Sequence, residues 1–127
     1  LDGDGDVDVV VSQNHGPARV LLNQWGQDSS WIGFRLVAPN GGRDMLGARV
    51  AVGLTDGRTL WRRCYSDGSY LSASDPRILV GLGEAEGIER VEVHWPDGSA
   101  ETWRDLVPRR VHLLRQGEGR IWSETTP

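Results

Sequence analysis

Short apolar runs, most of them alternating with polar residues, recur along the whole of this chain. Alternation with a period of two and enrichment in valine and tryptophan are typical of β-strands. The pattern predicts nine strands: Val7–Ser12, Arg19–Asn23, Ile32–Ala38, Ala48–Leu54, Thr59–Tyr65, Ile78–Gly81, Arg90–Trp95, Ala100–Trp103 and Val111–Arg115. Helical spacing is almost absent, so the chain is expected to be all-β.

Two Asp-Gly pairs predict hairpin turns between these strands. They lie in "LTDGRTL" over residues 54–60 and in "WPDGSAE" over residues 95–101. Such pairs tolerate the positive φ angles that tight primed turns require. Alternate valines give the strands over 48–54 and 90–95 one apolar face each. Pairing such faces across a core predicts an antiparallel β-sandwich or a flattened barrel.

A polar stretch, "QWGQDSS" over residues 24–30, interrupts the strand pattern near the beginning of the chain. It predicts a linker that divides the chain into a part over 1–28 and a β domain over 29–127. The first part holds only two short strands, and an isolated hairpin is marginally stable in water. Residues 7–23 are therefore expected either to fold back onto the sandwich or to exchange with a second copy in a homo-oligomer.

Composition and charge exclude several classes of function. The 127 residues are 38% hydrophobic and 25% charged, as is typical of one globular domain. The net charge of −4 argues against a nucleic-acid or anionic-membrane surface. The single cysteine, Cys64, is expected to be buried. One cysteine and three scattered histidines also provide no zinc-binding spacing.

The chain begins with "LDGDGDVDVVVS", in which aspartates recur at every second position. Calcium collects about six to eight oxygen ligands, so closely spaced carboxylates on a glycine-rich backbone suit it. The EF-hand pattern fails when it starts at the first aspartate, because Val7 stands where glycine is needed. It matches better when the first ligand lies one residue before Leu1. The candidate calcium ligands are Asp2, Asp4, Asp6 and Asp8.

Several longer motifs resemble one family when they are taken in order. They are "NGGRDMLGARV" over 40–50, "SDGSYLSASDPR" over 66–77, "VGLGEAEGIERVEVHWPDG" over 80–98 and "VPRRVHLLRQGEG" over 107–119. This order is similar to that of the ASPIC/UnbV domain, found at the carboxyl end of cartilage acidic protein and in many bacterial proteins. The resemblance covers roughly Trp31 to Gly119. It implies no particular reaction, but relatives at the extracellular matrix imply a secreted or cell-surface protein.

The opening stretch up to residue 24 resembles the end of an FG-GAP or VCBS-type repeat, the calcium-binding blade unit of β-propellers. This second resemblance implies that the four aspartates belong to the calcium loop of such a repeat. The repeat is incomplete, because the family pattern begins with an aspartate one residue before Leu1. Calcium is therefore expected to bind weakly, if the missing ligand is not supplied by a neighbour.

Two kinds of catalysis remain open from the residues alone. A serine hydrolase needs a serine, a base and an acid within hydrogen-bond reach, and a glycosidase needs two facing carboxyl groups. Turn capping and a solvated surface are the structural alternatives for the same residues. Tyr70 and Leu71 are expected to anchor their loop against the core. The candidate nucleophile and acids are Asp67, Ser69, Asp75, Asp97 and Glu101.

Six tryptophans are too many for the core of so small a domain, so some are expected at the surface. Trp61 and Trp103 are the expected exposed pair, and such rings stack on the apolar faces of sugars. The sequence therefore predicts a non-catalytic binding or accessory module that binds a glycan or a protein surface. A small glycosidase or esterase is the alternative. Neither a nucleic acid nor a membrane is expected as a partner.

Overall fold

The computed structural model describes residues 7–24, 30–40, 42–67, 70–71, 73–85 and 87–121. These residues form ten strands and no helix, so the all-β prediction is confirmed. The strands are β1 (Val9–Gln13), β2 (Gly16–Leu21), β3 (Ser30–Val37), β4 (Arg49–Leu54), β5 (Thr59–Arg63), β6 (Ile78–Gly83), β7 (Ile88–His94), β8 (Ala100–Trp103), β9 (Val111–Arg115) and β10 (Arg120–Ile121). None of the described elements is a helix that is long and apolar enough to span a membrane.

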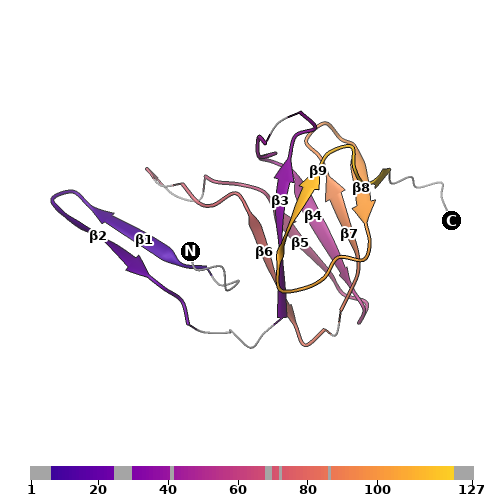
Figure 1. The fold of residues 1–127 in the computed structure, drawn as a ribbon, viewed down its shortest axis with the longest axis horizontal. Coiled ribbons are helices and arrows are strands. Elements are labelled where there is room, and N and C mark those ends of the chain that lie inside the picture. Colours follow the sequence, from indigo (N-terminus) through magenta and orange to yellow (C-terminus); the bar gives the residue numbers. More distant parts are fainter. Residues whose placement is uncertain are drawn as a thin grey trace.

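Two sheets pack face to face and form the predicted sandwich (Figure 1). One sheet has the strand order β10-β8-β7-β4-β5, and the other has the order β6-β3-β9. The pairings are antiparallel except that β9 runs parallel to β3. Nothing in the hydrophobic pattern indicated this parallel pair, because alternation shows which face of a strand is apolar but leaves the direction of its neighbour open.

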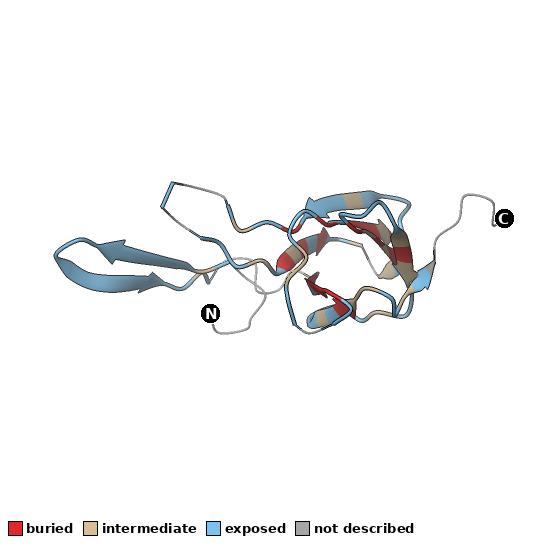
Figure 2. Cartoon of the chain, turned by 90° about the horizontal axis from the view of Figure 1, so that it is seen from above, coloured by how far each residue is buried: buried red, intermediate tan, exposed pale blue. Residues whose placement is uncertain are grey.

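The core lies between the two sheets, where Figure 2 shows the buried residues facing one another. Inward positions alternate along the strands, as in Ile32 and Phe34 of β3 and Val50 and Val52 of β4, which are all fully buried. Burial of each such side chain contributes about 1.5–3 kcal/mol. The further buried members of the cluster include Leu36, Leu54, Ile78, Val80, Leu82, Val91, Val93, Trp95 and Leu114.

Both predicted Asp-Gly hairpins are present, but their turns differ from the expected primed type. In each, only the glycine has a positive φ: 92° at Gly57 and 92° at Gly98. The amide of Gly57 donates to Leu54 O at 3.1 Å, and the amide of Leu54 donates to Arg58 O at 2.8 Å. This is a type I turn followed by a left-handed glycine, the usual form of a hairpin loop one residue longer.

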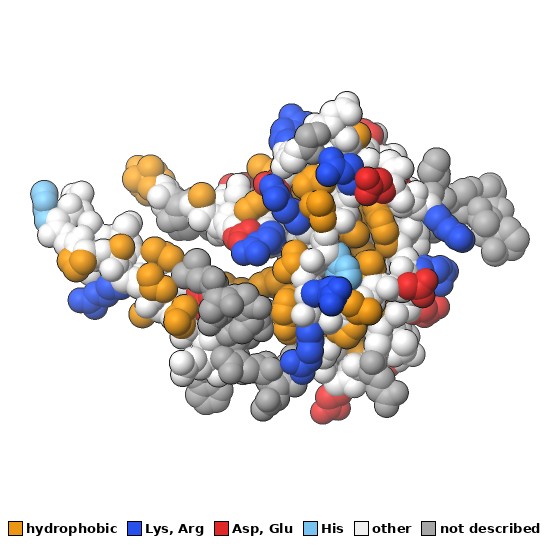
Figure 3. All heavy atoms as spheres, in the orientation of Figure 1, with side chains coloured by type: hydrophobic (Ala, Val, Ile, Leu, Met, Phe, Trp, Pro, Cys, Tyr) orange, Lys and Arg blue, Asp and Glu red, His pale blue; other side chains and the backbone are white. Residues whose placement is uncertain are grey.

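The β1–β2 hairpin stands away from the sandwich as an arm (Figures 1 and 2). Every residue of β1 and β2 is exposed, and the hairpin includes the apolar Val9, Val11 and Leu21. Figure 3 shows hydrophobic side chains along the arm. The hairpin therefore does not fold back onto the sandwich, which removes one of its two expected arrangements. Exchange with a second copy stays a prediction.

Candidate functional site

The outer face of the five-stranded sheet carries the most prominent exposed aromatic ring on a strand of the sandwich. Trp61 lies on β5 opposite Ala51 of β4 and points away from the core. The Trp61 side chain is 49% exposed, whereas Ala51 is only 2% exposed. Because Ala51 points to the same outer face, its burial indicates that neighbouring side chains cover it; its cross-strand neighbours are Trp61 and Glu92. The Trp61 ring thus lies on the outer face of the sheet with about half of the residue accessible to solvent.

Polar side chains of the neighbouring strands border the Trp61 ring. The guanidinium carbon of Arg49 lies 5.7 Å from the ring centroid, within the range of a cation–π contact. The His94 imidazole lies 5.3 Å away, centroid to centroid, with a tilt of 41°. These residues share a face because β4 pairs with both β5 and β7, which aligns Arg49 with Arg63 and with His94. The ring is therefore held at two of its sides.

An open hollow adjoins this surface at the end of β5. It has a volume of about 350 Å³ and is lined by Leu46, Gly47, Arg63, Cys64, Tyr65, Ser66 and Asp67. The Arg63 guanidinium carbon lies 5.3 Å from the Tyr65 ring centroid, and Tyr65 is 46% exposed. Cys64, one of the lining residues, is buried, and burial raises the pKa of its thiol above the ordinary value. Cys64 thus has the structural role predicted for it.

Trp103 does not join Trp61 at the surface, contrary to the expectation of an exposed pair. Trp103 is opposite Val91, which faces the core, so the two tryptophans lie on opposite faces of the sheet. The Trp103 ring packs against the core, and it meets Trp95 edge-on with centroids 6.3 Å apart. The expectation of exposure was wrong because Trp103 lies one residue out of phase with the outward positions.

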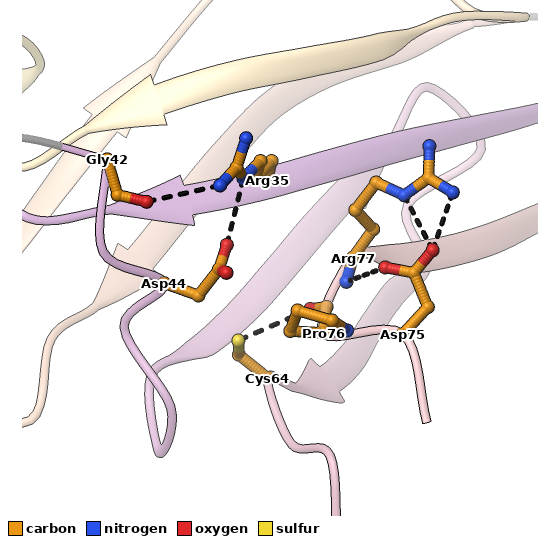
Figure 4. A network of polar contacts seen from close by, with 7 residues as sticks. All are labelled: Arg35, Gly42, Asp44, Cys64, Asp75, Pro76 and Arg77. Carbon is orange, nitrogen blue, oxygen red and sulfur yellow. Dashed lines mark hydrogen bonds and ion pairs between the residues drawn. The ribbon is translucent and has the colours of Figure 1, made fainter. Parts of the chain in front are cut away.

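The loop between β5 and β6 is held by polar contacts, which Figure 4 shows in part. The Ser74 amide donates to Ser66 O at 2.9 Å, and the Cys64 thiol donates to Pro76 O at 3.3 Å. Tyr70 and Leu71 are 87% and 88% exposed, so the prediction that they anchor the loop against the core was wrong. Local hydrogen bonds at both ends of the loop allow its apolar tip to stay in solvent.

The candidate catalytic acids of this loop have separate surroundings. Asp67 lies 3.9 Å from the Arg63 guanidinium, and its side chain is 81% exposed. Asp75 accepts hydrogen bonds from the Arg77 side chain and amide, and Arg77 holds the pKa of that carboxyl below its ordinary value. Ser69 lies outside the described residues. In the described part of the loop, the contacts of both aspartates are therefore with arginines.

Asp97 and Glu101 both contact the turn between β9 and β10. Asp97 accepts hydrogen bonds from the Ser99 hydroxyl and amide and from the Gln116 side chain, and these bonds, led by that of the Ser99 hydroxyl, lower its pKa. Glu101 is 5% exposed and accepts hydrogen bonds from the Trp95 indole and from the amides of Gly117 and Gly119. These roles are structural: Asp97 caps a turn, and Glu101 is closed to a substrate.

The histidines supply no catalytic pair among the described residues. His112 Nε2 contacts Val107 O at 2.8 Å, and His94 Nε2 lies 3.7 Å from Glu92 Oε2. No hydrogen bond of the described chain joins a serine hydroxyl to a histidine ring, so the serine, base and acid arrangement is not assembled there.

The candidate calcium loop falls mostly outside the described part of the chain. Asp2, Asp4 and Asp6 precede residue 7, where the description begins. Asp8 is described, and its carboxylate accepts a hydrogen bond from the Asn23 amide at 2.9 Å. Within the described ranges no group of three or more His, Cys, Asp or Glu residues could hold a metal ion. Calcium binding thus stays a prediction.

A comparison with protein-family models found a match to ASPIC and UnbV over residues 38–121. The chain belongs to this family. The matched segment begins at the end of β3 and includes the whole five-stranded sheet, so the Trp61 surface and the adjoining hollow lie within the ASPIC and UnbV domain. A search of curated proteins found no match.

Sequence reasoning found Trp61 but missed its neighbours Arg49, Tyr65 and His94. A signal for Tyr65 was present, because Trp61, Arg63 and Tyr65 alternate and so share a face of an extended strand. Arg49 and His94 could be found only through the strand register, which the hydrophobic pattern does not determine.

Proposed function

We propose that this ASPIC and UnbV domain is a non-catalytic accessory module that binds a glycan on the outer face of its five-stranded sheet. The observation that carries the proposal is the Trp61 ring, which is half exposed on a sheet face whose other outward residues are polar or small. An aromatic ring supported in this way presents a rigid apolar platform at little entropic cost. Sugar rings have apolar faces that stack on such a platform.

The surroundings of the candidate acids favour binding over hydrolysis. A glycosidase needs one carboxyl group that stays protonated near neutral pH and a second that faces it. Asp75 and Asp97 instead have lowered pKa values because they accept local hydrogen bonds. Glu101 is buried and accepts three donors of the chain. The esterase or glycosidase alternative therefore receives no support from these three acids.

Trp61→Ala tests the proposal, with Tyr70→Ala as the matched control because Tyr70 is an exposed aromatic residue of the β5–β6 loop, outside the sheet face. A glycan array and affinity electrophoresis against polysaccharides would measure binding. We expect the wild-type protein and Tyr70→Ala to bind the same glycans, and Trp61→Ala to lose about 30-fold in affinity, the usual effect of removing a central aromatic contact. Retention of full affinity by Trp61→Ala, or the absence of any glycan ligand, would refute it.

Catalysis is tested on the same preparations. Chromogenic glycosides and esters should show no turnover above the buffer rate. Reproducible hydrolysis that is lost on Asp67→Asn or Ser69→Ala would instead favour the hydrolase alternative.

The exposed hairpin supports a further part of the proposal, that the module belongs to a larger exported protein with FG-GAP or VCBS-type repeats. Apolar side chains occupy both faces of β1 and β2, as expected of strands that other strands cover. Calcium titration followed by NMR at Asp8 and Asn23 tests the calcium loop: shifts at millimolar calcium are expected, and unchanged spectra would contradict it. Light scattering tests whether residues 7–23 exchange between two copies.

A further inference from the structure

A second exposed ring extends the Trp61 surface along the edge strand of the sheet. Beyond the end of β5 the chain stays extended, because Cys64 N donates to Ala48 O at 2.8 Å and Gly47 N donates to Cys64 O at 2.8 Å. Cys64 points into the core, so alternation directs Tyr65 to the same side as Trp61 and Arg63. Four residues of extended chain place the two rings about 13 Å apart along the strand.

Each of the two rings has an arginine beside it. Arg49 approaches the Trp61 ring to 5.7 Å, and Arg63 approaches the Tyr65 ring to 5.3 Å. Arg49 forms no ion pair with a carboxylate of the described chain. Among the described residues, the acid that pairs with Arg63 is Asp67, at 3.9 Å and with an 81% exposed side chain. Such an exposed ion pair contributes little to stability in water. Both guanidinium groups can therefore receive an anionic ligand.

The outer face of this sheet differs in charge from the chain as a whole. The outward positions that the strand register pairs include one glutamate, Glu92, and four arginines, which gives a formal charge of +3; the arginines are Arg49, Arg63, Arg90 and Arg120. Glu89, an exposed residue in the bulge of β7, lowers this charge to +2 if it is counted with them. The whole chain has a net charge of −4. Arg90 pairs with Glu92 at 3.2 Å, so the uncompensated positive charge lies mainly at the β4–β5 end of the face.

We infer that the glycan recognised here is anionic, a linear chain with carboxylate or sulfate groups that lies along β5. This inference rests on the proposed glycan-binding function and names its substrate class. Trp61 and Tyr65 stack on sugar rings, while the planar forks of Arg49 and Arg63 bind the acidic groups between them. The mixture of stacked rings and guanidinium groups favours a polymer in which apolar ring faces and anionic substituents alternate.

Paired polymers that differ only in charge test the inference on the intact chain. Polygalacturonate is compared with its methyl ester, and dextran sulfate with dextran, by isothermal titration calorimetry at low and high salt. At least one anionic polymer should bind about tenfold more tightly than its neutral counterpart, and salt should weaken that binding. The pair that shows the difference identifies the acidic group as carboxylate or sulfate.

Arg49→Gln and Arg63→Gln should each lower the affinity for the anionic polymer about five- to tenfold, since each removes a charge-assisted contact at a partly solvated site. Arg110→Gln is the control, because it removes an equal charge from an exposed position next to β9. Its affinity should be unchanged. Thermal unfolding midpoints equal to that of the wild type establish that the variants are folded. Arg63→Lys keeps the charge but not the planar guanidinium group, so its affinity should lie between those of the wild type and Arg63→Gln.

The outcomes separate the two proposals. Equal affinity for charged and neutral polymers, with Arg49→Gln and Arg63→Gln silent, would overturn the anionic specificity but leave glycan binding intact. If Trp61→Ala bound with unchanged affinity, glycan binding at this site would be overturned as well. Equal binding of a single-stranded oligothymidylate through the same arginines would identify general polyanion binding and would also overturn the inference.

Discussion

Glu101 connects the β9–β10 turn to the core, and its removal should destabilise the whole sandwich. Glu101 lies opposite Val93 on the core-facing side of β8, and it is only 5% exposed. One oxygen accepts the Trp95 indole N–H, and both approach the Gly117 amide at 3.0 Å, while the Gly119 amide donates at 3.1 Å. Three donors from two segments thus depend on one side chain.

The magnitude follows from what each donor loses in Glu101→Ala. Trp95 is 3% exposed, so its unpaired indole N–H costs about 2 kcal/mol. Gly117 is exposed and Gly119 partly exposed, so water can replace the lost acceptor and each amide costs about 0.5–1 kcal/mol. The free energy of unfolding should therefore fall by about 3–4 kcal/mol. Glu101→Gln keeps one acceptor oxygen but turns an amide group towards donors, and it should cost about 2 kcal/mol.

Urea titration followed by tryptophan fluorescence measures these losses, and hydrogen exchange at Gly117 and Gly119 shows whether the turn is released. Glu118→Gln is the control, because Glu118 lies in the same turn with a 63% exposed side chain and should change stability by less than about 0.5 kcal/mol. A loss below about 1 kcal/mol in Glu101→Ala, with the turn still protected from exchange, would refute the reasoning.

Three further predictions concern packing and pH. Gly33→Ala should cost about 1–3 kcal/mol in chemical denaturation, since the added methyl would lie 2.9 Å from Val111 Cγ2, whereas Gly81→Ala meets nothing within 4 Å and should be silent. Tyr70→Ala should change the free energy of unfolding in the same titration by less than about 0.5 kcal/mol, because the residue is 87% exposed; a large loss would show that the loop tip packs against the domain. Asp75 has a lowered pKa in the folded protein, so its contribution to stability is complete above about pH 4 and is lost as the pH falls through the folded pKa. The free energy of unfolding, measured from about pH 5 to 2, should therefore depend less on pH in Asp75→Asn than in the wild type.

Hydrophobic alternation predicted the fold well, because it reports directly on burial. The strands β8 and β9 begin and end where the pattern placed them, and the inward valines of β4 and β7 are buried as expected. The two-residue β10 escaped prediction because Arg120 and Ile121 show no alternation of their own. What holds β10 is pairing with β8 and the neighbouring turn that Glu101 binds, both contacts between segments distant in sequence.

The candidate site was only partly predictable, because the strand register, and not the composition, determines which side chains lie together on a sheet face. Trp61 could be placed on an outward position from its own strand. Trp103 could not, since a shift of one residue in the strand register decides whether its ring points to solvent or to the core. Glu101 was a candidate acid by residue type, but the donors that make it structural come from Trp95 and from a turn more than fifteen residues away.

The structure separates the residues that stabilise the domain from those that we propose bind its ligand. The inner face of the five-stranded sheet holds the valine core, Trp103 and Glu101, so substitutions there act on folding. The outer face holds Trp61 and its arginines, which contact solvent and one another. Because adjacent residues of one strand serve opposite faces, Arg49→Gln removes a ligand contact while Val50 keeps its place in the core. A variant that loses affinity with an unchanged unfolding free energy therefore reports on the outer face alone.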